Sequence, residues 1–592
     1  MKHMIAAAAM MAMVFSACAQ ENLAVLEARP GQPAPGEMLY TSLQRDVDAA
    51  LDRRQDRYGQ LKTADDVAAC QQELKAFFIE QLGGFPERTP LNARTVATLD
   101  RDGYRIEKVM FESRPGFHVT GLLHLPVTPG PHPAVLVPCG HSANGKASEA
   151  YQTGSILMAR NGVAAFCFDP FGQGERYQVL SEDGKPRHST TTEHTLAGAG
   201  CILLGLNAAT YEIWDGMRAI DYLQSREDID PKRIGCAGNS GGGTQTAYFM
   251  ALDDRIQCAA PSCYITSLRR LTDTIGPQDA EQNIHGQIAR GMDHADYIIM
   301  RAPKPTLLCC ATRDFFDIQG AWDSFRQAKR VYTRLGLPEG VDLVETDEEH
   351  GWTAELRSGT ARWMRRWLLN TNAPLTGQEC VILTDEEAQC TEQGQVLLLD
   401  GARSVYDLNA EIEAGYAAGR AALWSGDAAA ALARVREIAD IRPLDQVPAC
   451  TVETLGTIDR GGYRIEKQVF VPSEGIVVPA LRFVPAQPVG AVCLYAHGGG
   501  KQAEAAPGGA IEALVKQGLT VVAVDLPGLG ETTSAKDPKG GFSKRFSPNW
   551  KEFFLAYKLD RSLLGMRAES LLMLARALGG TVQVAGVGEA GP

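Results

Sequence analysis

Residues 233–243 read Arg-Ile-Gly-Cys-Ala-Gly-Asn-Ser-Gly-Gly-Gly, and this stretch does most to decide the fold. Its apolar first half predicts a strand, and the residues from Thr244 onward predict a helix. Between them, Gly238-Asn239-Ser240-Gly241-Gly242 fits the G-x-S-x-G pattern of a tight strand-to-helix turn, where glycines avoid side-chain clashes. Such a turn indicates a nucleophilic Ser240, with the amide of Gly241 as a candidate oxyanion donor. The alternative is a glycine-rich turn that contains a serine by chance.

Length and composition limit the classes of protein. The chain has 592 residues, which predicts about two to four domains. Apolar residues make up 45% and charged residues 22%, as in soluble globular proteins. The net charge of −13 argues against nucleic acid or an anionic membrane as a partner. The sequence does not indicate an oligomeric state.

The first 19 residues are expected to be a secretory signal. Lys2 and His3 precede an apolar run at 4–15, and small residues follow. Two processing routes are open. Ala17-Cys18-Ala19 fits a cut before Gln20, and Ser16-Ala17-Cys18 resembles a lipoprotein box in which Cys18 is lipidated. Either route predicts export to the periplasm or the extracellular space, with membrane attachment only through Cys18.

The 14 cysteines are scattered and lack the spacing of a zinc site. Several of them (Cys139, Cys167, Cys236, Cys309, Cys310 and Cys493) lie in apolar runs and are expected to be small buried hydrophobes. Cys258 with Cys263, and Cys380 with Cys390 across an expected hairpin, are close enough in sequence to form disulfides after export.

Two phrases recur in the same order along the chain. Residues 103–108 (Gly-Tyr-Arg-Ile-Glu-Lys) return at 462–467, and residues 169–175 (Asp-Pro-Phe-Gly-Gln-Gly-Glu) are matched by 525–531 (Asp-Leu-Pro-Gly-Leu-Gly-Glu). A repeat this long predicts tandem domains and not a solenoid. The second copy is expected to place Ala590 where the first has Ser240, and so to lack the nucleophile. Whether it is a natural remnant or a truncated fragment stays open.

Strands and helices alternate through the first copy, which predicts a doubly wound, mostly parallel sheet. Expected strands are 104–111, 118–125, 133–138, 163–168, 233–237, 256–261, 304–311 and 341–345; expected helices are 148–161, 204–224, 320–335 and 355–369. After the signal we expect a helical segment at 40–90, a catalytic domain at 91–370, a linker hairpin and helices at 371–449, and an incomplete second copy at 450–592.

A nucleophilic serine needs a base, and the base needs an orienting carboxylate. Asp314 follows the expected strand 304–311, and Asp317 is the alternative; either could instead cap the next helix. His350 follows the next strand and is the expected base. His285 and His294 precede the strand of the acid, and so break the chain order Ser, Asp, His.

The loop after strand 133–138 is expected to supply the second oxyanion donor, the amide of His141 or of Ser142. Residues 497–501 of the second copy, His-Gly-Gly-Gly-Lys, are its counterpart. Residues 140–146 also fit the G-x-x-x-x-G-K pattern of a phosphate-binding loop. However, Ala147 lacks the hydroxyl that would bind Mg²⁺, so nucleotide binding is not expected.

Residues 269–302 form a long insertion between two expected strands, a place where lids occur. Asp279 and Glu281 within it, and Trp352 beside His350, are candidate sugar contacts. The alternative for the insertion is an ordinary solvated helical segment.

Together these motifs resemble those of the acetyl xylan esterase group of α/β-hydrolases. The motifs are Cys139-Gly140-His141, residues 169–174, residues 238–243, Asp314 and His350-Gly351. The resemblance covers about residues 90–370, and residues 450–592 in degenerate form. The turn reads Gly-Asn-Ser-Gly-Gly-Gly where that group has Gly-Gly-Ser-Gln-Gly-Gly, which leaves the acyl group open. The resemblance implies an α/β-hydrolase fold and a serine esterase, with neither metal nor cofactor.

The resulting hypothesis is an exported serine esterase that removes acetyl or methyl groups from a polysaccharide or oligosaccharide. Its catalytic residues would be Ser240, Asp314 and His350. A pectin or glucuronate methyl esterase is the alternative within this class. A non-catalytic carbohydrate-binding protein is the alternative from another class, and it suits the second copy better than the first. An exported peptidase would need a larger lid or a propeller.

Overall fold

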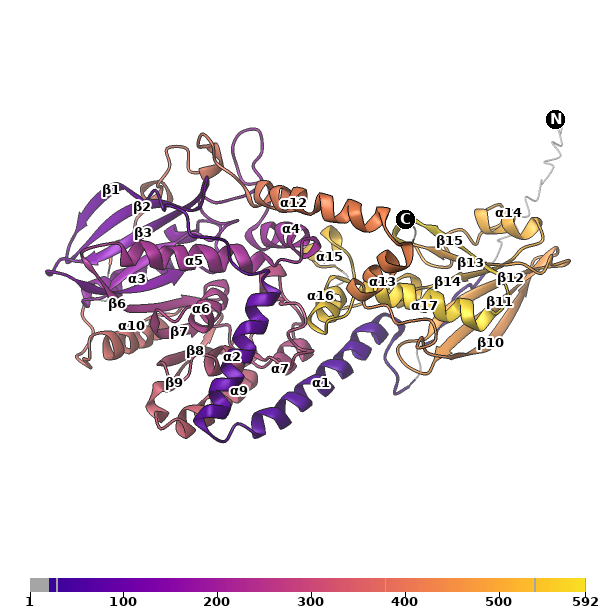
Figure 1. Cartoon of the computed structure of the whole chain (residues 1–592), viewed down its shortest axis with the longest axis horizontal. Coiled ribbons are helices and arrows are strands. Elements are labelled where there is room, and N and C mark those ends of the chain that lie inside the picture. The colour runs from indigo at the N-terminus through magenta and orange to yellow at the C-terminus, as the bar shows by residue number, and fades with distance from the viewer. Residues whose placement is uncertain (1–20, 28–29, 378–379, 537–538, 591–592) are drawn as a thin grey trace, which may run out of the picture. The chain divides into compact units, whose positions relative to one another are not determined.

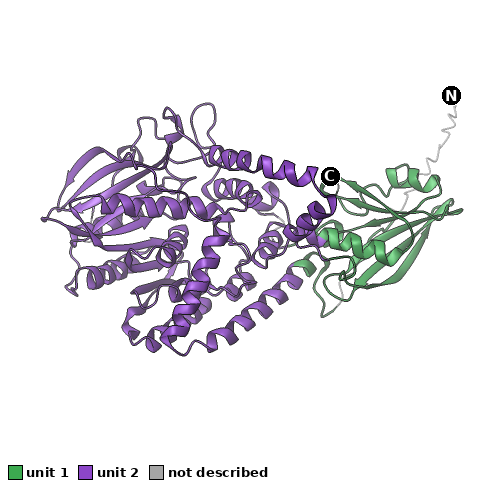
Figure 2. Cartoon of the chain, viewed as in Figure 1, with its two compact units in different colours: residues 1–39, 443–535, 567–592 green, residues 40–442, 536–566 purple. Residues whose placement is uncertain are grey.

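The computed structural model describes residues 21–27, 30–377, 380–536 and 539–590 (Figure 1). The expected signal, with Cys18 in it, lies outside the described residues. The chain divides into two compact units (Figure 2). One is formed by Met1–Leu39, Pro443–Ala535 and Arg567–Pro592; the other, larger unit by Tyr40–Arg442 and Lys536–Met566.

The larger unit is built on a nine-stranded sheet with the order β1-β2-β3-β5-β4-β6-β7-β8-β9. The strands are β1 Arg94–Arg101, β2 Tyr104–Arg114, β3 Phe117–Pro126, β4 His132–Pro138, β5 Ala164–Phe168, β6 Ile229–Asn239, β7 Ile256–Ser262, β8 Thr306–Arg313 and β9 Val341–Glu349. From β1 to β5 the neighbours in this order are antiparallel, and from β5 to β9 they are parallel. The order reverses between β5, β4 and β6, which puts the carboxyl ends of β4 and β6 side by side, where ligands bind in such sheets.

Helices cover both faces of this sheet. On one face, α3 (Glu149–Arg160) and α10 (Ala354–Leu368) share a core with Val135 and Val137 of β4. Alternate residues of β4 point to the other face, where α5 (Ala208–Gln224) and α6 (Gly241–Leu252) pack against the same strand. This layering, with the serine turn at the end of β6, is the α/β-hydrolase fold, and the expected fold class is confirmed.

Further helices complete the larger unit. They are α1 Met38–Gly59, α2 Ala64–Gln81, α4 Thr190–Leu203, α7 Leu268–Asp273, α8 His294–Ile299, α9 Ile318–Arg334, α12 Val405–Ser425 and α13 Ala428–Ile438. The expected helical segment near the N-terminus corresponds to α1 and α2, and Thr63 begins α2 with a capping box to Asp66. Helix α4 was not expected, because Thr-Thr-Thr and two glycines are poor helix formers; it is stabilised by packing against α5.

The stretch after α10 differs from the expected hairpin. In the described parts of 371–403 there is no strand, and the short helix α11 (Asp385–Ala388) lies between Cys380 and Cys390. Thr384 and Glu387 form a reciprocal capping box that favours this helical turn over a strand. Both cysteines are free thiols, as are Cys258 and Cys263, so the structure contains neither of the two disulfides that the sequence allows.

The smaller unit contains a six-stranded sheet with the order β10-β11-β12-β14-β13-β15. Its strands are β10 Cys450–Asp459, β11 Tyr463–Pro472, β12 Val478–Pro485, β13 Val492–His497, β14 Thr520–Val524 and β15 Val582–Val587. This order repeats the first six positions of the larger sheet. Helices α14 (Ala510–Lys516) and α17 (Leu563–Leu578) accompany it.

The recurrent Asp-x-x-Gly-x-Gly-Glu phrase has the same structural role in both units. In the larger unit, Lys146 Nζ lies 2.6 Å from both Asp169 and Glu175, and all three side chains are buried. In the smaller unit, Lys501 Nζ lies 2.7 Å from Asp525 and also contacts Glu531. The lysine of the apparent phosphate-binding loop is therefore held in a buried ion cluster.

The structure of the second copy differs in two details from what its sequence led us to expect. The register pairs Leu136 with Cys236 in the larger sheet and Leu494 with Val584 in the smaller one. The residue directly after β15 is Gly588, with φ of 64°, as Ser240 with φ of 59° directly follows β6. Gly588, and not Ala590, thus occupies the turn position, and it carries no nucleophile. Residues 536–566, grouped with the second copy by sequence, belong to the larger unit.

Within the described ranges, no single helix has the length and apolar composition of a membrane span. Helices α4 and α5 meet these criteria only as a pair that is bent by 104°.

Candidate active site

The serine turn is formed by close backbone contacts that only glycine permits. Ser240 has φ of 59° and ψ of −125°, outside the regions that side chains favour. A Cβ on Gly238 would lie 2.6 Å from the carbonyl oxygen of Gly242, and one on Gly242 would lie 2.2 Å from that of Pro138. Helix α6 begins at Gly241 and not near Thr244, because the surrounding backbone fixes the three glycines of its first turn. The amide of Gly241 is among the first four of the helix, which have no partner inside it.

Three of the expected site residues come together at the carboxyl ends of their strands. Ser240 follows β6, Asp314 follows β8 and His350 follows β9. His350 Nε2 lies 2.8 Å from Ser240 Oγ. On the other side of the ring, His350 Nδ1 lies 2.8 Å and 2.9 Å from the two carboxylate oxygens of Asp314. Because a carboxylate only accepts hydrogen bonds, Nδ1 carries the hydrogen and Nε2 of the neutral ring can accept the serine proton.

The surroundings hold this line of hydrogen bonds in place. The side chain of Asp314 is 2% exposed and that of His350 is 20% exposed, so the base borders the solvent and the acid does not. Asp314 also accepts a hydrogen bond from the amide of Phe316. The ring of Phe315 lies 4.2 Å from the imidazole of His350, centroid to centroid, and covers one of its faces.

The other candidates for acid and base have different partners. Asp317 accepts a hydrogen bond from the amide of Gly320 as the cap of α9, and it pairs with Arg270. His285 contacts Gln81. His294 is buried 4.6 Å from the ring of Tyr264, centroid to centroid, and burial lowers its pKa to about 3.

The loop after β4 is tied to the serine turn. The Tyr151 hydroxyl accepts a hydrogen bond from the amide of Gly140 and donates one to the carbonyl of Asn239. Gln173 donates a further hydrogen bond to the carbonyl of Gly140. Ser142 Oγ is bonded within the loop, to the carbonyl of Gly140. The ring of His141 lies against Gly241, since a Cβ on Gly241 would be 3.0 Å from His141 Nε2.

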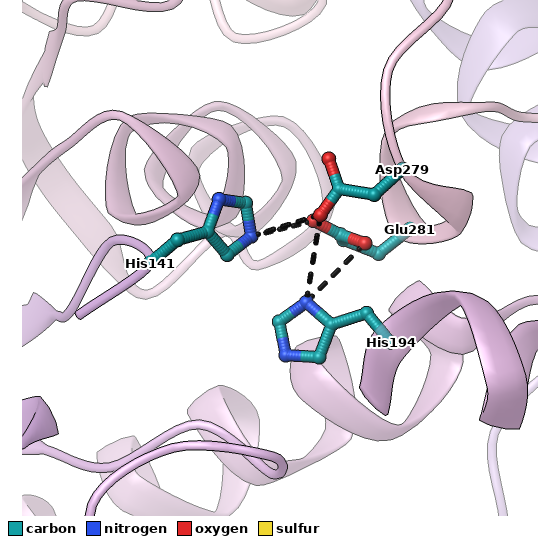
Figure 3. Close-up of side chains that lie close together, drawn as sticks. All are labelled: His141, His194, Asp279 and Glu281. Carbon is teal, nitrogen blue, oxygen red and sulfur yellow. Dashed lines mark hydrogen bonds and ion pairs between the residues drawn. The ribbon is translucent and has the colours of Figure 1, made fainter. Parts of the chain in front are cut away.

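The His141 side chain enters a buried cluster that the sequence analysis identified only in part (Figure 3). Its Nε2 lies 2.9 Å from Glu281 Oε1 and 3.1 Å from Asp279 Oδ2. His194 of α4 approaches the same two carboxylates, and its ring lies edge-on to that of His141 with centroids 5.1 Å apart. Asp279 and Glu281 are 5% and 1% exposed, so the insertion around them is a buried part of the site and not a solvated segment.

Charges in this cluster shift one another's protonation. Burial disfavours a charged His194, but the carboxylates of Glu281 and Asp279 outweigh it and hold its pKa above the ordinary value. Conversely, His194 and His141 hold the pKa of Glu281 below its ordinary value despite burial. Burial raises the pKa of Glu212, on α5, to about 8. His194 was missed together with helix α4, and Glu212 was missed because nothing in the sequence of α5 marks a buried polar residue as part of a site.

The loop that carries Glu281 is supported by α16 (Trp550–Lys558), from the segment 536–566 of the larger unit. The amides of Gly286 and Ile288 donate to the carbonyls of Tyr557 and Lys558, at 2.9 Å and 2.8 Å. Lys558 Nζ donates to the carbonyl of Gln282, and burial lowers the pKa of this lysine to about 7. This support joins residues some 276 positions apart, which local patterns do not reveal.

Trp352 has a different place from the one expected. It is 3% exposed and packs in the core against Tyr151, with ring centroids 5.8 Å apart. A buried indole has no face left for a sugar, so we assign Trp352 to packing. Gly154 is small enough to admit the ring, since a Cβ there would lie 2.7 Å from it.

Comparisons with known proteins gave matches to part of the chain. Residues 62–294 match the model of the acetyl xylan esterase family. The resemblance expected from the motifs is thereby confirmed over that segment. The protein YtaP of Bacillus subtilis (strain 168), named as a hydrolase, is 27% identical over 312 residues, which are 48% of this chain and 96% of that protein.

Similar solved structures were also found. Methylesterase BT1017 is 22% identical, with a TM-score of 0.41, and the match covers 66% of this chain and 80% of that chain. A glucuronoyl esterase from Solibacter usitatus is 14% identical, with a TM-score of 0.38, and the match covers 50% of this chain and 91% of that one.

Proposed function

We propose that the chain is a serine esterase that removes acetyl groups from a plant-type polysaccharide or oligosaccharide. The match to the acetyl xylan esterase family supports an enzyme that hydrolyses carbohydrate esters. The observation that carries the serine mechanism is the continuous line of hydrogen bonds from Ser240 through His350 to Asp314. A carbohydrate-binding role without catalysis would not require this line.

In the proposed reaction, His350 Nε2 takes the proton of Ser240 while Oγ attacks the ester carbonyl. Asp314 holds the ring by its Nδ1–H and stabilises the imidazolium that forms. The amides of Gly241 and His141 are the proposed donors to the oxyanion. The alcohol then leaves with the proton from His350. Water activated by His350 attacks the acyl-enzyme and releases the acid together with free Ser240.

The acyl group is the part of this proposal that most needs an experiment. Purified enzyme is incubated with acetylated xylan and, separately, with methyl-esterified pectin, and the released acetate and methanol are measured. We expect acetate from xylan and little methanol from pectin. Methanol in place of acetate would assign the enzyme to uronate methyl esters, in which the sugar acid is the acyl group. No release from either substrate, or equal release by Ser240→Ala, would contradict the esterase function.

We also propose export, on the basis of the N-terminal sequence described above. Sequencing the N-terminus of the mature protein tests this. A start at Gln20 would indicate soluble export, and a lipidated Cys18 would indicate a membrane-anchored lipoprotein. An intact Met1 on cytoplasmic protein would contradict export.

A further inference from the structure

Four side chains with metal-ligating atoms gather beside the serine turn: His141, His194, Asp279 and Glu281 (Figure 3). One such atom from each lies within 4.8 Å of the others. The residues come from separate parts of the larger unit: the loop after β4, helix α4, and the turn at residues 279–282. The fold, and not one local motif, therefore brings these four side chains to the same place.

The hydrogen-bond geometry of His194 brings several acceptor atoms together at this point. Its Nε2 lies 2.8 Å from the carbonyl oxygen of Phe171, which can only accept, so Nε2 carries the hydrogen. In a neutral ring, Nδ1 then carries a lone pair and no hydrogen. It faces Glu281 Oε2 at 3.3 Å and Asp279 Oδ2 at 3.8 Å. None of these three atoms makes a hydrogen bond to any residue that the structure describes.

Converging lone pairs in a buried site are stable only with a proton or a cation between them. The second nitrogen of His194 is already fixed by a backbone carbonyl, which is the outer-shell arrangement typical of metal-bound histidine. His141 presents its Nε2 to the same two carboxylates. The cluster therefore offers two nitrogen and two oxygen ligands.

The spacing and the donor types favour a small divalent transition-metal ion. The distances from His141 Nε2 to Glu281 Oε1 and Asp279 Oδ2 are 2.9 Å and 3.1 Å, and those from His194 Nδ1 are 3.3 Å and 3.8 Å. Ligands placed tetrahedrally at about 2.0–2.1 Å from Zn²⁺ are roughly 3.3–3.4 Å apart. Imidazole and carboxylate suit zinc and its neighbours, whereas Ca²⁺ takes six to eight oxygen ligands.

We propose that His141, His194, Asp279 and Glu281 bind one divalent transition-metal ion such as Zn²⁺. The ion would lie near Gly241, because a Cβ on that residue would be only 3.0 Å from His141 Nε2. The side chain of His141 is 15% exposed and the other three are at most 5% exposed, so the ion would enter from the His141 side. A cation here would add positive charge beside the proposed oxyanion donors. That catalytic role rests on the proposed function, whereas ion binding does not.

A second group of metal-ligating residues, Cys263, Asp314 and His350, serves as an internal comparison. His350 and Asp314 are already bonded to each other, and burial raises the pKa of the Cys263 thiol to about 12, which disfavours the thiolate ligand. We therefore expect no tight site there.

The test uses the full chain, freed of metal by dialysis against a chelator and then equilibrated with zinc sulfate. Bound zinc is measured by mass spectrometry of the dialysed protein. We expect one zinc ion per chain, and binding at least about tenfold weaker in Glu281→Gln, which removes a ligand but keeps the shape. His350→Gln, which alters the second group, should bind zinc like the wild type.

His194→Asn provides a second ligand variant, and circular dichroism checks that each variant is folded. Binding of Co²⁺ gives an independent readout, since a tetrahedral site yields visible absorption that both ligand variants should lose. Absence of stoichiometric zinc, or equal affinity in the wild type and both variants, would overturn the site. If zinc binds as expected but no ester is hydrolysed, the proposed function fails and the metal site stands. If esters are hydrolysed but no zinc binds, the metal site fails and the proposed function stands.

Discussion

Asp314 and Asp317 carry the same carboxylate and stand three positions apart, yet they have separate tasks. Asp314 faces the ring of His350. Asp317 faces the first turn of α9 and the guanidinium of Arg270. The direction of the chain as it leaves β8 decides which carboxylate reaches the histidine.

Replacing each of the two by asparagine separates these tasks. Asp314→Asn should lower kcat by about 10³–10⁴-fold, because the ring loses the partner that fixes its tautomer. Asp317→Asn should leave kcat nearly unchanged, since asparagine also caps helices, and lose only the pairing with Arg270. Hydrolysis of p-nitrophenyl acetate by both variants measures this. Equal losses in kcat would contradict the assignment of the acid.

His294 should make the larger unit sensitive to acid. Burial lowers its pKa to about 3 from an ordinary 6.5, so below pH 6.5 the unfolded chain takes up a proton that the folded chain does not. Stability should therefore fall as pH drops from 6.5 toward 3, by up to about 1.4 kcal/mol per pH unit from this group. His294→Phe keeps the aromatic packing and should show a shallower loss in urea unfolding between pH 7 and pH 5. Equal slopes would contradict a neutral buried His294.

At the scale of elements, the serine turn depends on how closely β4, β6 and α6 approach each other. The backbone of Pro138 and Gly140 on the β4 side lies against Gly242, where a side chain would have no room. The strained Ser240 is thus held by the elements around it and not by its own preference.

Gly242→Ala tests this packing. Its Cβ would lie 2.2 Å from the carbonyl oxygen of Pro138, so the turn must shift, and we expect kcat to fall by at least about 100-fold. Gly415→Ala in α12 is the matched control, because no heavy atom lies within 4 Å of its new Cβ. This control should keep its activity and gain roughly 0.5–1 kcal/mol of helix stability. A fully active Gly242→Ala would show that the turn tolerates displacement.

Helices and strands could be predicted from the sequence better than the contacts between them. The strands around Ser240, Asp314 and His350 have strong apolar runs, and the chain order of the three residues follows from the fold. By contrast, the hairpin expected near residue 385 is a capped helical turn. Helix α4 was missed, and with it His194, because the threonines and glycines of α4 form a helix only when packed.

Contacts across long separations in the chain were the least predictable. The support of the Glu281 loop by α16 joins segments that share no local pattern. Trp352 was a candidate sugar contact, but its side chain packs against Tyr151, and the direction of a side chain depends on what packs beside it. Such features depend on tertiary packing, and the periodic spacing of apolar residues in the sequence carries no information about it.

At the scale of the whole molecule, the two units have equivalent buried ion clusters. Lys146 and Lys501 occupy the same place in their sheets and pair with equivalent acids. Removing one partner of a buried cluster leaves uncompensated charge and costs about 3–5 kcal/mol. Because each cluster stabilises its own unit, the two substitutions should act on different unfolding transitions.

Calorimetry of Lys146→Met and Lys501→Met tests this independence. We expect two transitions in the wild-type chain, with Lys146→Met lowering one of them and Lys501→Met lowering the other. Esterase activity after mild heating should follow the transition that Lys146→Met affects. A single transition that both substitutions lower equally would show that the units unfold together.

The proposed function depends on Ser240 Oγ being the atom that attacks the ester. Covalent labelling of this serine tests it most directly. The full chain is treated with a fluorophosphonate, which reacts with activated serine hydroxyls, and peptide mass spectrometry locates the adduct. We predict one adduct per chain, on the peptide that contains Ser240, together with loss of activity, and no adduct in Ser240→Ala. An adduct on another residue, or an unlabelled enzyme that hydrolyses esters, would contradict the account.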